Sequence, residues 1–92
     1  MLSRFSAVIA KEHDQEAVLA LDVVLREMGA LRLWRWAGHA GSQEIEVRWY
    51  LIQFRFVTTR RETFVGLMLS GPRVLVEAIA ADTLARIAVA AP

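Results

Sequence analysis

Arginine and aromatic side chains crowd the middle of the chain. Between Arg26 and Arg61, seven arginines accompany three glutamates, whereas the rest of the sequence carries four basic and seven acidic residues. Guanidinium groups bind phosphates and carboxylates, and flat rings stack on nucleic-acid bases. The candidate anion or ligand contacts are Arg32, Arg35, His39, Arg48, Arg60 and Arg61. The candidate binding or interface residues are Trp34, Trp36, Trp49, Tyr50, Phe54, Arg55, Phe56 and Met68.

This composition supports two interpretations. If rings and arginines share one face of a sheet, they form a surface for single-stranded nucleic acid. If the rings instead fill a core and an interface, the arginines stack over them at the rim. The formal net charge is only +1, and no glycine-aromatic consensus of RNA-binding sheets is present. We therefore favour the interface interpretation. The excess of arginine over lysine is itself typical of a GC-rich bacterial genome.

The sequence shows no grouping of residues that a catalytic mechanism needs. The loop around His39 lacks the spacing of a phosphate-binding loop, and His13 lies beside acidic residues that are too close in sequence to converge on one metal ion. Glu44 and Glu46 point the same way along a strand, but we expect a solvated or cross-strand-paired edge there. With no cysteine in the chain, thiolate chemistry and disulfides are excluded. We predict no catalytic residue, no metal and no cofactor.

The elements that position these residues follow from hydrophobic periodicity. A stripe over 17–28, with Asp14 as its cap and Gly29 after it, predicts a helix. A second helix is expected to begin at Gly71-Pro72. Residues 84–90 suit a final strand or a continuation of that helix equally well. Strands are predicted over 4–10, 30–36, 44–58 and 62–70, with a glycine-containing loop at 38–42 and a polar turn at 58–61.

The segment from Glu44 to Thr58 is the most informative. Its first half places alternate apolar residues on one side, and its second half reverses the phase, so the apolar set changes face across residues 49–52. We predict that either a bulge turns this long strand over or both of its faces are covered at the middle.

These elements predict one domain over 1–92 with an α+β fold. The expected architecture is a two-layer sandwich, with an antiparallel or mixed sheet of four to five strands and two helices on one face. The order β-α-β-β-β-α, with or without a final strand, is similar to the ferredoxin-like arrangement. Two helices cover one face of such a sheet. Leaving roughly 600 Å² of apolar surface on the other face exposed to water would lose about 15 kcal/mol of hydrophobic stabilisation. We therefore predict a homo-oligomer, with a dimer favoured.

The function that we expect is that of a small non-catalytic binding or accessory module, regulatory or protein-binding, which pairs with a protein partner or its own copy. The first alternative is a cofactor-free dimeric α+β barrel enzyme or small-ligand-binding protein, with Trp34, Trp36, Trp49, His39 and Arg55 around a pocket. Single-stranded nucleic-acid binding is the least favoured alternative. Because no uncharged run exceeds ten residues, we predict no membrane span and a cytoplasmic location.

Overall fold

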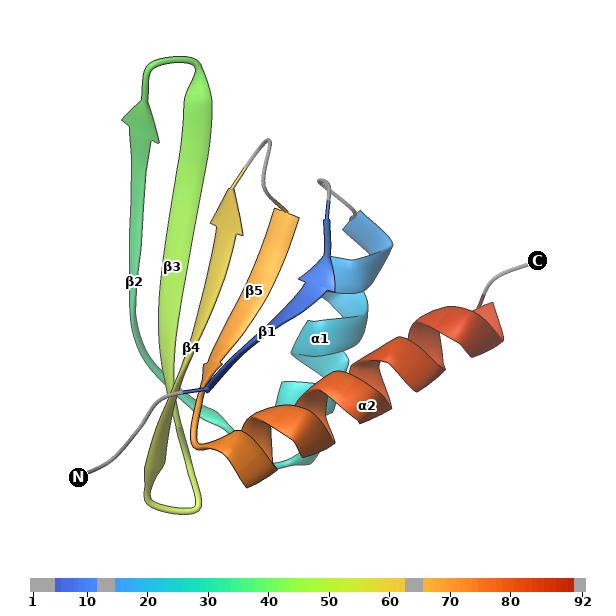
Figure 1. The fold of residues 1–92 in the computed structure, drawn as a ribbon. Helices are drawn as coiled ribbons and strands as arrows, with labels where there is room; N and C mark the ends of the chain where they lie inside the picture. Colours follow the sequence, from blue (N-terminus) through green and yellow to red (C-terminus); the bar gives the residue numbers. More distant parts are fainter. Residues whose placement is uncertain (1–4, 12–14, 63–65, 91–92) are drawn as a thin grey trace.

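The computed structural model describes residues 5–11, 15–62 and 66–90. These residues form five strands and two helices (Figure 1). In chain order the elements are β1 (Phe5–Ala10), α1 (Gln15–Glu27), β2 (Leu31–Ala40), β3 (Gln43–Ile52), β4 (Arg55–Glu62), β5 (Gly66–Gly71) and α2 (Arg73–Ala90). The predicted Asp14 cap, His13 and residues 63–65 of the predicted strand 62–70 lie outside the described residues.

The strands make one sheet in the order β1-β5-β4-β3-β2. Every neighbouring pair is antiparallel, so β2 to β5 form a meander and β1 adds to its end beside β5. Both helices lie on one side of the sheet (Figure 1). The predicted α+β fold, with a five-stranded antiparallel sheet and two helices, is confirmed. The similarity to the ferredoxin-like arrangement is not confirmed, since α2 follows a meander of four consecutive strands.

The prediction of a single strand over 44–58 is wrong. The chain reverses at Gln53-Phe54, and both residues have positive φ, 51° and 64°. Two central residues with positive φ match the twist of a two-residue β-hairpin. The apolar set does not change face within β3. Instead, odd-numbered positions face away from the helices throughout, and even-numbered positions face them, polar at Glu46 and apolar at Ile52.

Two further boundaries differ from the predictions, and the structure decides between the two alternatives left open for residues 84–90. Residues 58–61, predicted as a polar turn, lie within β4. The predicted loop at 38–42 shrinks to a turn at Gly41-Ser42, because β2 continues to Ala40. Residues 84–90 are helical rather than a strand. The buried Thr83 hydroxyl donates to the Ile79 carbonyl oxygen at 2.7 Å, so this residue is satisfied inside α2 and does not interrupt it.

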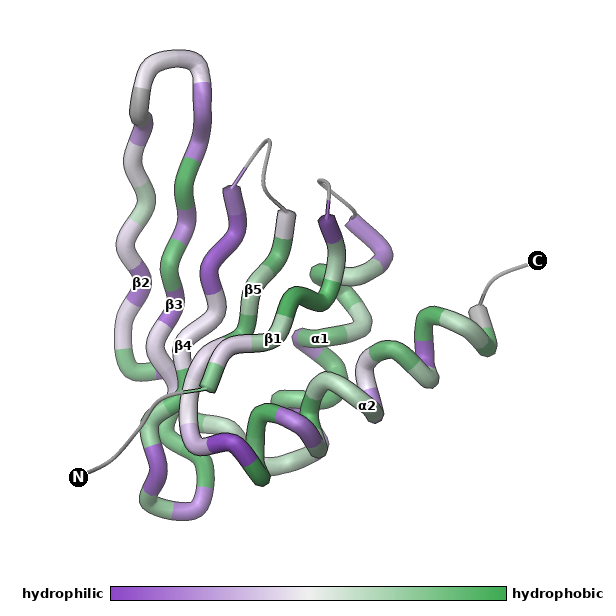
Figure 2. Tube along the Cα trace, viewed as in Figure 1, coloured by the Kyte–Doolittle hydropathy of each residue, from purple (hydrophilic) through white to green (hydrophobic). Residues whose placement is uncertain are grey.

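The core lies between the helices and the sheet. Figure 2 shows hydrophobic positions gathered where β1, β5 and the two helices meet. The stripe of α1 is buried as predicted, and Gly29 ends the helix with φ at +75° while the Ala30 amide donates to the Leu25 carbonyl oxygen at 2.9 Å. The largest fully buried side chains are Leu25, Ile52, Leu69, Ile79, Val24, Val57, Val76 and Thr83.

Candidate functional site

The two sides of the β2–β3 hairpin carry opposite chemistry. Side chains alternate across a strand, and the register pairs Trp34 with Trp49 and Arg35 with Arg48. The tryptophans therefore face away from the helices, and the two arginines face the helix side. We call the sheet surface without helices the open face.

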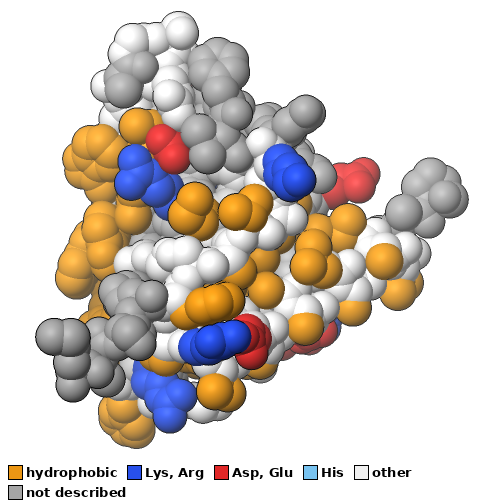
Figure 3. Space-filling model, viewed as in Figure 1, with side chains coloured by type: hydrophobic (Ala, Val, Ile, Leu, Met, Phe, Trp, Pro, Cys, Tyr) orange, Lys and Arg blue, Asp and Glu red, His pale blue; other side chains and the backbone are white. Residues whose placement is uncertain are grey.

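The open face is apolar over β2 and β3. Trp34 is 57% exposed and Trp36 52% exposed, and the Trp34 and Trp49 ring centroids lie 5.4 Å apart. In the view of Figure 3, hydrophobic side chains gather along the β2 side of the molecule. The large apolar residues that the register places on this face are Leu31, Trp34, Trp36, Ile45, Val47, Trp49, Leu51, Phe56, Met68 and Val8.

The part of the open face over β1 and β5 has smaller side chains. The row that begins with Trp34 and Trp49 continues across the sheet through Thr58, Ser70 and Ser6. Ser6 and Ser70 are joined by a hydrogen bond of 2.8 Å between their hydroxyl oxygens. In this row, large rings therefore occupy the positions on β2 and β3, and small hydroxyl side chains occupy those on β4, β5 and β1.

On the helix side, three arginines converge on one carboxylate. Glu46 on β3 has a side chain only 9% exposed. Arg61 Nη2 lies 3.2 Å and Arg48 Nε lies 3.3 Å from its Oε1, while Arg35 Nε donates to Oε2. Arg48 also reaches Asp22 on α1, with 3.4 Å between Nη1 and Oδ1. We call these five residues the arginine cluster; it ties three strands to α1.

The cluster fixes the charge state of its members. Burial raises the pKa of the Glu46 carboxyl, but the hydrogen bond from Arg35 and the charges of Arg48 and Arg61 lower it by more, so the net pKa lies below its ordinary value. Burial lowers the pKa of Arg48, and a hydrogen bond with Tyr50 and the charge of Glu46 raise it above its ordinary value. Both groups are thus held in their charged forms.

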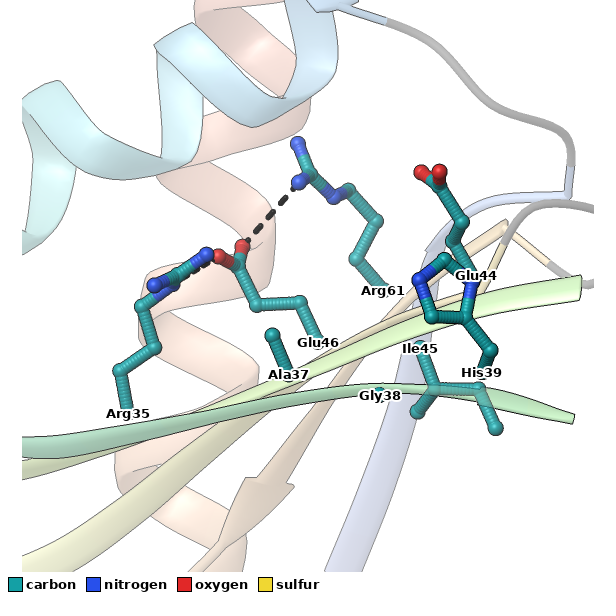
Figure 4. A pocket seen from close by; sticks show the side chains of 8 residues that line it. All are labelled: Arg35, Ala37, Gly38, His39, Glu44, Ile45, Glu46 and Arg61. Atoms are coloured by element: carbon teal, nitrogen blue, oxygen red, sulfur yellow. Dashed lines mark hydrogen bonds and ion pairs between the residues drawn. The ribbon is translucent and has the colours of Figure 1, made fainter.

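A hollow of about 310 Å³ opens beside this cluster. Arg35, Arg61 and Glu46 line one end of it, and His39 and Glu44 lie further along the β2–β3 hairpin (Figure 4). Figure 4 shows Arg35 and Arg61 reaching the Glu46 carboxylate from opposite sides. A smaller hollow next to it, of about 260 Å³, is lined by Arg32 and Arg48 among others.

The structure separates the residues singled out from the sequence. Trp34, Trp36, Trp49, Phe56 and Met68 share the open face. Tyr50 is buried on the helix side, and Phe54 and Arg55 lie at the β3–β4 turn. Of the candidate anion contacts, Arg60 alone faces away from the helices, where it pairs with Glu62 at 3.2 Å.

The sequence did not identify Glu46 as the residue on which the arginines converge. The expectation of a solvated or cross-strand-paired edge holds for the pairing, since Glu46 lies opposite Arg61 in the register, but the carboxylate is buried. The signal that identifies it is the hairpin register, because a turn at Gly41-Ser42 places Arg35 and Arg48 side by side next to Glu46.

No known family model, curated protein or solved structure matches this chain. Among the described residues, no three His, Asp or Glu side chains gather in a way that would hold a metal ion. Neither helix, over the residues described, is long and apolar enough to cross a membrane. The open face and the arginine cluster are therefore the two features of the molecule that bear on its function.

Proposed function

We propose that this chain is a small non-catalytic binding module that acts as a homodimer, with its two copies joined through their open faces. The observation that carries the proposal is the exposed apolar half of this face. Leu31, Trp34, Trp36 and Phe56 are each more than half exposed. From the size of such side chains, these four leave roughly 400 Å² in water, which is the size of the largest apolar patch on an ordinary monomer, and such patches often mark an interaction surface.

The size of the face supports a dimer. Five strands spaced about 4.8 Å apart and 20–33 Å long give roughly 500–800 Å² of flat surface. A stable interface buries about 800 Å² on each partner. The face reaches this area only at the upper end of its range, so a dimer joined through it uses nearly the whole sheet, and sheets packed in this way lie about 10 Å apart.

The pattern of large and small side chains supports a second copy as the occupant. In a two-fold dimer, a surface must complement itself. With the axis parallel to the strands near Thr58, the row across the sheet meets its own reverse. Trp34 then lies over the partner copy's Ser6, and Trp49 lies over the partner copy's Ser70, so both rings of this row meet a small side chain.

The alternative functions have less support. A surface for single-stranded nucleic acid needs rings and cations on the same face. Here Trp34 and Trp36 face away from the helices, whereas Arg32 and Arg35 face toward them. Arg60 shares the open face with the rings, but it is paired with Glu62. The same orientation removes the tryptophans from any pocket between sheet and helices, which the barrel-enzyme alternative requires.

The mass in solution tests the proposal. We expect the wild-type chain to sediment at twice 10.3 kDa at micromolar concentration. Trp34→Glu places a charge in the proposed interface and should raise the dimer dissociation constant at least 100-fold. Val89→Glu is the control, because Val89 is 87% exposed on α2. The proposal would be contradicted if the wild-type chain were a monomer at about 100 µM, roughly 100 times a dissociation constant of 1 µM. Equal effects of both variants would also contradict it.

A further inference from the structure

The arginine cluster presents more positive charge than its carboxylates neutralise. Arg35, Arg48 and Arg61 face two acidic partners, Glu46 and Asp22, which leaves a surplus of one positive charge. Arg32 lines the adjoining hollow together with Arg48 and adds to that surplus. Glu44 lies at the other end of the larger hollow, toward the hairpin turn (Figure 4). The cluster end of the hollow is therefore the cationic end.

Glu46 orients the guanidinium groups of Arg35 and Arg61 while it contacts only one N–H donor of each. A guanidinium carries five N–H donors, whereas one carboxylate has two oxygens. Arg35 contacts Glu46 through Nε and Arg61 contacts it through Nη2. Within the part of the chain that the structure describes, Glu46 is the acidic partner of both. Each guanidinium is thus held in place by one contact while further N–H groups remain for a ligand.

Holding these groups in advance favours anion binding. Guanidinium forks match carboxylate and phosphate geometry, and donors that are already fixed lose less entropy on binding. The hollow of about 310 Å³ is at the small end of ligand-binding pockets. Its size and polar lining fit a small molecule with one or two oxyanion groups.

We propose that this hollow binds the oxyanion group of a small ligand, a phosphate or a carboxylate, through Arg35 and Arg61, with Arg48 behind them and Glu46 as the positioning residue. The site lies on the helix side of the sheet, so it does not depend on the homodimer proposed for the open face. Two sites per dimer would remain accessible.

Titration calorimetry with inorganic phosphate and with succinate distinguishes the two sources of oxyanion. Sodium chloride replaces either salt to keep the ionic strength constant, because nonspecific screening would otherwise imitate binding. We expect saturable binding of at least one probe. A phosphate preference identifies a phosphate-bearing ligand, and a succinate preference identifies a carboxylate. Absence of saturable binding of both probes up to about 10 mM, a weak affinity by any ligand standard, overturns the proposal.

Arg35→Gln and Arg61→Gln should each weaken binding of the preferred probe about tenfold or more, as expected for a lost charge-assisted contact. Arg60→Gln is the matched control. The Arg60 side chain is 52% exposed, like that of Arg35, but it lies on the open face with Glu62. It should change the affinity less than twofold. An equal loss in Arg60→Gln would show screening by net charge rather than a site.

The two proposals fail separately. Arg35→Gln should leave the sedimented mass unchanged, and Trp34→Glu should leave probe binding within twofold of wild type. Because Arg35 is half exposed, we expect its replacement to leave the core intact, and a circular dichroism spectrum like that of the wild type would check this. If Trp34→Glu abolished probe binding while the chain stayed folded, the hollow would require the dimer, and the independent site proposed here would be wrong.

Discussion

Glu46 is charged in a position where burial alone would favour the neutral acid. Removing a carboxylate from water costs several kcal/mol, and this cost is offset only when hydrogen bonds and opposite charges replace the solvent. Here three guanidinium groups supply that replacement, and one of them, that of Arg48, also pairs with Asp22 on α1. The same contacts hold β2, β3 and β4 to α1 where the apolar core does not reach. A single acidic residue thus sets the geometry of three basic ones.

The lowered pKa of Glu46 predicts how stability depends on pH. In the unfolded chain this carboxyl titrates near pH ~4.3. Since its folded pKa lies lower, its contribution is complete above the unfolded value and is lost as the pH falls through the folded value. Glu46→Gln should cost about 2–4 kcal/mol at pH 7, because it leaves Arg35 and Arg61 without their carboxylate and Arg48 with Asp22 alone. Urea unfolding at fixed protein concentration measures both effects.

The difference between wild type and Glu46→Gln should shrink as the pH falls from about 5 toward 3, since protonation then neutralises the wild-type carboxyl as well. Glu77→Gln is the control, because the exposed pair between Glu77 and Arg73 contributes little. A difference that stays constant across this range would mean that charge is not what Glu46 contributes.

At the scale of elements, the β3–β4 turn is the least favourable local structure in the described chain. Bulky residues rarely adopt positive φ, and Phe54 does so with 95% of its surface exposed. Phe54→Gly relieves the backbone and removes no buried surface. We expect it to raise the free energy of unfolding by about 0.5–1 kcal/mol, after the greater entropy of unfolded glycine is subtracted.

Chemical denaturation of Phe54→Gly measures this change, with Val89→Gly as the comparison. Val89 is also an exposed apolar residue, but it lies in a helix. Its replacement should lower the free energy of unfolding, since glycine disfavours helices by up to about 1 kcal/mol. A loss of stability in Phe54→Gly greater than 1 kcal/mol, on the scale of a buried aromatic ring, would show that the ring is covered in solution.

This turn also explains which elements the sequence could predict. The stripe of α1 and its ending at Gly29 follow from local rules, and the structure confirms them. Gln53-Phe54 contains no glycine, asparagine or proline, so nothing local marks the reversal, and one strand was expected where two exist. Over residues 84–90 the sequence favours a helix and a strand equally. The hydrogen bond from Thr83 to Ile79, which satisfies this polar residue inside α2, is seen only in the structure.

The candidate site was predictable in residue type but not in sidedness. Arg60 and Arg61 are neighbours in sequence, yet the first lies on the open face and the second contacts Glu46. Their placement depends on the register of β4 against β3, and a shift of one residue would exchange them. That register is set by the unmarked turn, so composition identified the arginines while their convergence remained hidden.

At the scale of the whole molecule, the helices leave the turn end of the β2–β3 hairpin uncovered. The helix α2 packs against β1, β5 and α1, and the hairpin extends past both helices (Figure 1). Alternation along two strands then gives an apolar side and an arginine-rich side only one sheet thickness apart. A dimer joined through the apolar side would carry its two arginine clusters on its outer surfaces, where a ligand can enter.

The pairing of rings with small side chains predicts a compensating double variant. Ser6→Trp places a second ring where the partner copy's Trp34 is expected to lie, so it should weaken the dimer at least tenfold by overpacking. Trp34→Ser alone should weaken it by loss of buried area. The double variant Ser6→Trp with Trp34→Ser again places one ring against one small residue at each contact. Its dimer dissociation constant should therefore return to within about threefold of the wild-type value. Sedimentation over a dilution series gives all four constants, which form a double-mutant cycle. Additive effects would mean that Ser6 and Trp34 do not meet across the two-fold axis, and the axis proposed near Thr58 would then be wrong.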